Sequence, residues 1–185
     1  MAAWPTEPID KYLLKDGDRD AKVYIVLGGH RQGTSFLSRV LRQSGVKMKG
    51  GPHQFEDGDF VALNAKIIQA AGGTWRDPPG SDELLEAGGL HEIEIAELLQ
   101  EKRDWGGSFW GWKDPRQPLT IRSYMPALKA MHDDVYLICI FRKPARAIAS
   151  LQRIRQASER QAQKMITRYA EEIIAAIREW VRVEV

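Results

Sequence analysis

Apolar runs alternate with helical periodicities along this chain. Unbroken or alternating apolar positions predict strands over 22–27, 46–48, 108–112, 135–141 and 180–185. Apolar positions that recur every three or four residues predict helices over 34–43, 57–71, 82–102, 119–131 and 161–179. The third of these helices contains Gly88-Gly89, where a break is expected. This alternation predicts an α/β fold, a three-layer domain with a mainly parallel central sheet flanked by helices.

Length and composition add limits to that picture. A chain of 185 residues fits one domain, 1–185, and its 43% apolar and 28% charged content is ordinary for a globular protein. The single cysteine, Cys139, lies in the apolar run 135–141, so a buried strand thiol is expected rather than a nucleophile, a disulfide or a zinc ligand. No targeting segment opens the chain and no run reaches the length of a membrane span, so we expect a cytoplasmic protein.

Charge is distributed unevenly although the net charge is only +2. Residues 82–104 contain eight acidic side chains, whereas residues 141–168 contain eight basic side chains and one acid, Glu159. A basic segment of this kind forms a solvated surface, an anionic-ligand site or a nucleic-acid surface. No nucleic-acid recognition motif accompanies it, so a nucleic-acid partner is not expected.

A glycine-rich segment follows the first predicted strand and opens the first predicted helix. Residues 28–35 read Gly-Gly-His-Arg-Gln-Gly-Thr-Ser, and Gly28, Gly33 and Ser35 fit the spacing of a phosphate-binding loop. Thr34 stands where a nucleotide triphosphatase has lysine, and the cation lies inside the loop as Arg31. Converging N–H groups and the helix start predict anion binding. The loop alone leaves a generic P-loop protein and a plain strand-turn-helix open.

Two further motifs end later strands. Lys113 lies in Trp-Gly-Trp-Lys-Asp-Pro-Arg, where it is either a site residue, a surface residue or an ion-pair partner of Asp114. Arg142 ends the strand over 135–141, and Ser150 follows eight residues later, two turns into a helix that Pro144 can begin. Ligands of open parallel sheets bind where the strands end, so we expect the three cationic loops to share one edge.

These three motifs, in this order, resemble those of sulfotransferases, particularly bacterial and phage-type members whose loop reads G-x-H-R-S-G-T-S. The resemblance covers nearly the whole chain, and Gln32 replaces the usual serine. It implies a P-loop-type fold and transfer of a sulfuryl group from 3′-phosphoadenosine 5′-phosphosulfate, with release of adenosine 3′,5′-bisphosphate. It also implies roles for individual residues. The 5′-phosphosulfate would be held by Gly29, His30, Arg31, Gln32, Gly33, Thr34 and Ser35, and the 3′-phosphate by Arg142 and Ser150.

The resemblance implies three catalytic residues. Arg31 and Lys113 would stabilise the charge that develops during transfer, with Lys113 against the bridging oxygen. Phe55-Glu56-Asp57 points to Glu56 as the base, although acids at a helix start are also favoured by the helix dipole. The further candidates for the base are His53, then Asp57 or Asp59. The scheme requires no metal, and no metal-ligand spacing is evident.

Several points stay open at this level. The acceptor, a hydroxyl or amine compound, has no signature that separates carbohydrate, peptide, lipid and small alcohol. Trp75, in a Pro/Gly-rich loop, either covers an acceptor site or plugs the edge of the core. The chain ends in Val-Arg-Val-Glu-Val, before a basic segment usual in the sulfotransferases that it resembles, so either the protein is short or a C-terminal segment is missing. The alternative functions are a P-loop kinase and a non-catalytic nucleotide-binding protein.

Overall fold

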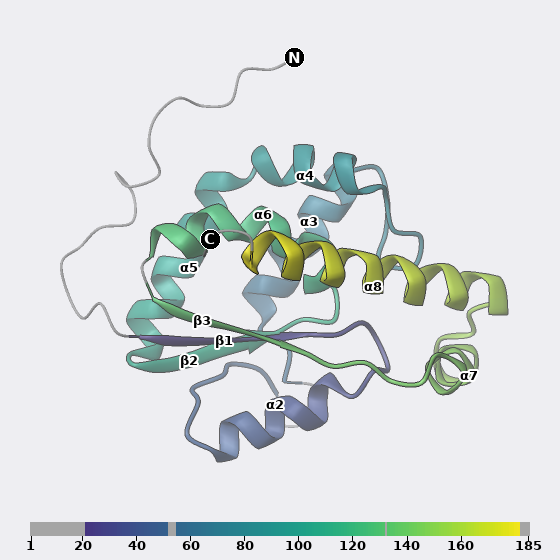
Figure 1. Ribbon diagram of the computed structural model, residues 1–185, viewed down its shortest axis with the longest axis horizontal. Coiled ribbons are helices and arrows are strands. Elements are labelled where there is room, and N and C mark those ends of the chain that lie inside the picture. The colour runs from purple at the N-terminus through teal and green to yellow at the C-terminus, as the bar shows by residue number, and fades with distance from the viewer. Residues whose placement is uncertain (1–20, 52–54, 132, 182–185) are drawn as a thin grey trace.

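The computed structural model describes residues 21–51, 55–131 and 133–181 (Figure 1). Its strands are β1 (Lys22–Leu27), β2 (Phe109–Lys113) and β3 (Asp134–Cys139). Its helices are α2 (Thr34–Gln43), α3 (Gly58–Ala70), α4 (Ser81–Gly89), α5 (Glu92–Gly106), α6 (Gln117–Ala130), α7 (Pro144–Arg155) and α8 (Glu159–Val181). The predicted α/β class is confirmed, and α4 and α5 separate close to the expected break at Gly88-Gly89.

The three strands form a parallel sheet in the order β2-β1-β3. β1 is the central strand, and Val23, Ile25 and Leu27 on it are fully buried. Figure 1 shows α2 on one face of the sheet and the group α3, α4, α5, α6 and α8 on the other, which gives three layers. α7 lies past the carboxyl ends of the strands, beside the loop between β1 and α2.

The main core fills the space between the sheet and the larger helical layer. Phe60 of α3 stacks on Trp112 of β2 with ring centroids 4.2 Å apart, and Tyr124 of α6 lies against both rings. Aromatic side chains bury large apolar areas and gain further energy from such ring contacts. The core therefore fixes β2, α3 and α6 relative to one another, and these elements supply half of the candidate site.

Two predicted strands differ in the structure. Residues 46–48 form only an isolated bridge, in which Lys47 pairs with Trp110 beside β2. The predicted strand over 180–185 is wrong at its start, because Trp180 and Val181 continue α8, and residues 182–185 lie outside the described part. Buried Ile173 and Ala176 on α8 show why: the apolar stripe keeps helical spacing up to Trp180, which packs on the core.

Helix α4 approaches α6 closely at Gly88. A Cβ atom on Gly88 would lie 1.9 Å from the hydroxyl oxygen of Ser123, so no larger residue fits there without movement.

In the part of the chain that the structure describes, no helix combines the length and the apolar character that crossing a bilayer requires.

Candidate functional site at the carboxyl edge of the sheet

The loop between β1 and α2 packs tightly against Ile140, the residue that follows β3. A Cβ atom on Gly28 would lie 2.7 Å from Ile140 Cγ2 and 2.8 Å from Thr34 Cγ2, so the glycine is sterically required. Gly33 has φ 101° and Arg31 has φ 69°, both in the left-handed region that glycine tolerates best. The turn leaves the start of α2 without a side-chain cap, which favours an anion there.

Gln32 occupies one of the amides that the loop would offer to an anion. The N–H of Gly29 donates to Gln32 Oε1 at 2.9 Å, and the N–H of Gln32 donates to the Gly29 carbonyl at 3.3 Å. The Gln32 side chain is buried with only 4% of the residue exposed. The side chain of Gln32 therefore occupies the Gly29 N–H, and an anion that binds this N–H has to displace the Gln32 side-chain carbonyl.

Arg31 connects the loop to α7. Its Nε donates to Ser150 Oγ at 3.0 Å, across 119 positions of the chain, and Ser150 is buried. Arg142 Nη1 donates to the Arg31 carbonyl at 3.3 Å. Arg31 and Arg142 remain exposed, so both guanidinium groups are accessible to a ligand. The first and third sequence motifs thus lie in direct contact.

Lys113, at the end of β2, is buried and forms an ion pair with a residue remote in sequence. Its Nζ lies 3.2 Å from Glu56 Oε1, just before α3, and Glu56 is partly exposed. Burial lowers the pKa of Lys113, an effect that the neighbouring Glu56 carboxylate opposes. A lysine held in such a place is poorly hydrated, so its charge acts strongly on any group brought next to it.

The alternative pairing of Lys113 with Asp114 is not what the structure has. Asp114 is fully buried and accepts hydrogen bonds from the Arg116 backbone N–H at 3.1 Å and from Arg116 Nη1 at 2.8 Å. Burial raises the pKa of the Asp114 carboxyl, and the Arg116 guanidinium opposes this rise. Asp114 therefore shapes the turn after β2.

A buried polar network supports that turn from below. Asn64 Nδ2 donates to Asp114 Oδ2 at 2.9 Å and to Gln117 Oε1 at 3.0 Å. Asn64 Oδ1 accepts from the Thr120 and Tyr124 hydroxyls at 2.7 and 2.9 Å. Because buried polar groups are costly unless paired, this hub ties α3 to the turn after β2 in one register. Lys113 and Glu56 come from the two segments that it joins.

The acids next to Glu56 have structural contacts instead. Asp57 caps α3 by accepting the Asp59 N–H at 3.1 Å, and its Oδ1 lies 3.1 Å from the buried Lys102 Nζ. Asp59 also pairs with Lys102. Phe55, which precedes Glu56, has a left-handed backbone with φ 54°. Of the three acids Glu56, Asp57 and Asp59, only Glu56 contacts Lys113. His53 lies outside the described residues.

His30 is a loop residue whose ring is buried and neutral. Burial, together with the positive charges of Arg116, Arg155, Lys113 and Arg31, lowers its pKa to about 3. Its Nε2 has no hydrogen-bond partner among the described residues, and its ring lies 4.3 Å from that of Trp75. The cations that act on His30 come from the loop, from β2 with the turn after it, and from α7.

Thr34 and Ser35 open α2 next to this loop, as the sequence predicts. Cys139, predicted to be buried, is half-buried at the end of β3, and burial raises the pKa of its thiol. Sequence reasoning did not single out Lys102, Arg116 or Arg155 as members of this region. Arg116 adjoins the Lys-Asp-Pro motif and was within reach of motif analysis, whereas Lys102 and Arg155 carry no local signal.

No protein-family model matches the chain, and neither a curated protein nor a solved structure matches it. Within residues 21–51, 55–131 and 133–181, no three His, Cys, Asp or Glu side chains gather as potential metal ligands. The function therefore has to be argued from the geometry of the site.

Proposed function

We propose that this chain is a sulfotransferase that uses 3′-phosphoadenosine 5′-phosphosulfate as sulfuryl donor and a hydroxyl or amine compound as acceptor. The observation that supports this best is the 3.0 Å contact between Arg31 and Ser150, which joins the loop motif to the 3′-phosphate motif. Those two motifs are the ones that would hold the two ends of the donor. A donor with phosphates at both its 5′ and 3′ positions fits two such adjacent anion sites.

The residues at the loop fit the donor in charge and shape. The amides of 29–35 and the exposed Arg31 suit the 5′-phosphosulfate, provided that Gln32 releases the Gly29 N–H. Arg142 and Ser150 suit the 3′-phosphate, since a planar guanidinium binds phosphate well and a hydroxyl donates a further hydrogen bond. Arg31 and Ser150, which bond each other here, would then turn toward the phosphates.

The chemical step would be a direct in-line transfer. Glu56 takes the proton of the acceptor hydroxyl, the acceptor oxygen forms a bond to sulfur, and the bond from sulfur to the bridging phosphate oxygen breaks. The electron pair of that bond stays on the phosphate, which leaves as adenosine 3′,5′-bisphosphate. Lys113 stabilises the charge that develops on the leaving oxygen. The 3.2 Å contact between Glu56 and Lys113 supports this step, because it brings together the proposed base and the proposed stabilising cation.

Ligand-induced stabilisation tests this proposal. Adenosine 3′,5′-bisphosphate in the presence of a chelator should raise Tm, with a stabilisation of about 2.7 kcal/mol at a hundredfold excess over Kd. Release of bisphosphate from the donor should then depend on an added acceptor. A shift with ATP and magnesium but none with millimolar bisphosphate would favour a kinase instead. Bisphosphate binding without transfer to any acceptor would favour a non-catalytic nucleotide-binding protein.

A further inference from the structure

The loop that carries Trp75 is fixed against α8. Tyr169 OH donates to the Trp75 carbonyl at 3.2 Å, and Arg168 Nε donates to the Pro79 carbonyl at 3.0 Å. Within the loop, the Thr74 N–H donates to the Asp77 carbonyl at 3.0 Å and the Asp77 N–H to Thr74 Oγ1 at 3.0 Å. Trp75 is therefore held in place by bonds on both sides.

Two arginines from separate segments meet at the Trp75 indole. The guanidinium carbon of Arg76 lies 4.9 Å from the ring centroid, and that of Arg155, at the end of α7, lies 5.8 Å from it. The same indole contacts His30, whose neutral ring adds no charge. Each exposed cation–π contact contributes only about 0.5–1 kcal/mol. These contacts therefore give little stabilisation for holding two like charges close together.

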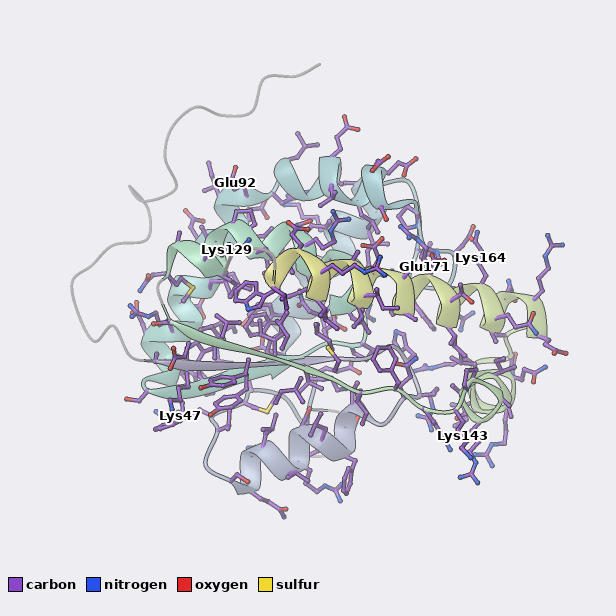
Figure 2. The ribbon with its side chains drawn as sticks, viewed as in Figure 1. Lys47, Glu92, Lys129, Lys143, Lys164 and Glu171 are labelled. Atoms are coloured by element: carbon purple, nitrogen blue, oxygen red, sulfur yellow. The ribbon has the colours of Figure 1, made fainter. Side chains whose placement is uncertain are left out.

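Neither guanidinium has a carboxylate partner within the described residues. The closest acids along the chain are already engaged, since Asp77 pairs with Lys164 and Glu159 accepts a hydrogen bond from Gln163. Arg76 and Arg155 are both exposed. Figure 2 shows further side chains that end in nitrogen around α7, among them Lys143, and Lys164 lies on the neighbouring helix α8. The pair is thus an accessible positive site without an internal counter-ion.

The pair lies beside the transfer site. Arg155 acts electrostatically on the same imidazole, His30, as Arg31 and Lys113 do. His30 directly precedes Arg31 in the loop, and its ring packs on Trp75. A ligand bound at the loop would therefore have the two arginines at its side, across the Trp75 indole that packs on His30.

We infer that Arg76 and Arg155, held on the Trp75 indole, form an anion subsite that selects acceptors carrying a carboxylate or sulfate near the reacting hydroxyl. This inference rests on the proposed function. The donor's two anionic ends already have partners in the loop and in the Arg142–Ser150 pair, which leaves this subsite to the acceptor. Acidic sugars and other anionic hydroxyl compounds are the substrate class that it fits, because a guanidinium pairs with planar carboxylates and with sulfates through two parallel hydrogen bonds.

Binding of glucuronate against glucose tests the subsite without requiring activity. The two sugars differ in one carboxylate, so saturation-transfer NMR at matched ionic strength, with and without adenosine 3′,5′-bisphosphate, measures its contribution. We expect wild-type protein to bind glucuronate at least about fivefold more tightly, as one charged hydrogen bond allows. Arg76→Ala/Arg155→Ala should abolish this preference. The control Arg153→Ala/Arg178→Ala removes the same charge from exposed positions without a Trp75 contact and should retain it.

Three results would overturn the inference: no preference for glucuronate in the wild type, preference retained in the Arg76/Arg155 variant, or equal loss in the control. A second measurement, with nucleotides, shows whether the pair binds an anion of the acceptor or the 3′-phosphate of the donor. If the Arg76/Arg155 variant loses affinity for adenosine 3′,5′-bisphosphate but not for adenosine 5′-monophosphate, the pair serves the donor's 3′-phosphate, and the acceptor subsite is rejected. If no variant binds the bisphosphate, the proposed function fails, yet glucuronate binding without nucleotide still decides the subsite.

Discussion

The two ends of the candidate site are built differently. At the end proposed to hold the donor, the donor end, Arg31 and Arg142 are exposed and bond to Ser150 and to a backbone carbonyl. At the end proposed for the transfer step, the chemical end, Lys113 is buried and pairs with Glu56, and the next residue, Asp114, is bonded to Asn64. Exposed guanidinium groups can exchange their partners at little cost. A buried ammonium cannot, because losing its partner leaves an unpaired charge in a poorly hydrated place.

This difference teaches how each end can serve a reaction. Under the proposed function, the donor end would open and close around a nucleotide, which few and accessible contacts permit. The chemical end would act on a charge that appears only in the transition state, which suits groups that are held in advance. Substitutions at the two ends should consequently affect different quantities, nucleotide affinity at one end and turnover at the other.

The largest expected effect is on turnover at the chemical end. Glu56→Gln retains the shape of the side chain and removes its basicity, so kcat should fall by about 10² to 10⁴ while Kd for adenosine 3′,5′-bisphosphate changes little. The measurement is bisphosphate release with an acceptor, alongside titration calorimetry. Glu94→Gln, the same exchange in an acid that pairs with Lys66, is the control and should leave turnover unchanged. Near wild-type turnover of Glu56→Gln would remove Glu56 as the base and move attention to His53.

A large effect on stability is expected at His30, which lies between the two ends. In the folded protein its pKa is lowered to about 3, whereas the unfolded chain takes up the proton near pH 6.5. The unfolded state thus binds more protons between these values, so stability should fall as pH falls, by up to about 1.4 kcal/mol per unit. Urea unfolding from pH 7.5 to 4.5 measures this slope.

His30→Phe should flatten that slope, because the variant has no proton to take up at this position. The surface histidine His91, which bonds Glu94, provides the control variant His91→Gln, and the slope should persist in it. An unchanged slope in His30→Phe would mean that the imidazole is hydrated in solution and that the loop packs less tightly than described.

A smaller effect, on affinity, is expected at the donor end. Arg142→Ala should weaken adenosine 3′,5′-bisphosphate binding by about tenfold to a hundredfold, the range of a charged hydrogen bond. Adenosine 5′-phosphosulfate, which lacks the 3′-phosphate, should bind the variant as it binds the wild type. Arg146→Ala, an exposed neighbour on α7, is the control. Equal losses for both nucleotides would contradict a 3′-phosphate role and assign Arg142 to the loop contact alone.

The smallest expected effect runs in the opposite direction. Gln32→Ala removes the side chain that competes for the Gly29 N–H, so bisphosphate affinity should increase by about two- to tenfold, the value of one hydrogen bond. Gln32→Ser, which introduces the residue found in the sulfotransferase loops that this one resembles, should do the same. Titration calorimetry measures the affinity, and Tm shows whether the loop remains folded. Weaker binding in both folded variants would show that Gln32 itself contacts the nucleotide.

The sequence by itself determined the elements and the loop. Apolar runs predicted β1 and α2 with the bounds that the structure has, because a buried central strand and an amphipathic helix impose strong patterns. Gly28 and Gly33 predicted a tight loop, and the structure leaves no room for a Cβ atom at Gly28 and gives Gly33 a left-handed backbone. The end of the chain was ambiguous, since Val-Arg-Val-Glu-Val alternates like a strand, while Trp180 continues the stripe of α8.

Only the tertiary structure decided which charges meet. Adjacency in the sequence suggested Asp114 as the ion-pair partner of Lys113. In the fold, Lys113 instead pairs with Glu56, 57 positions away, and Asp114 bonds to Arg116. The fold likewise brings Arg155 to Trp75 across the molecule. Charged side chains are long and carry no periodic signal, so their pairing depends on where the strands end and how α7 docks. Hydrophobic spacing can be recognised along the chain, whereas such a pairing exists only after packing has fixed the backbone.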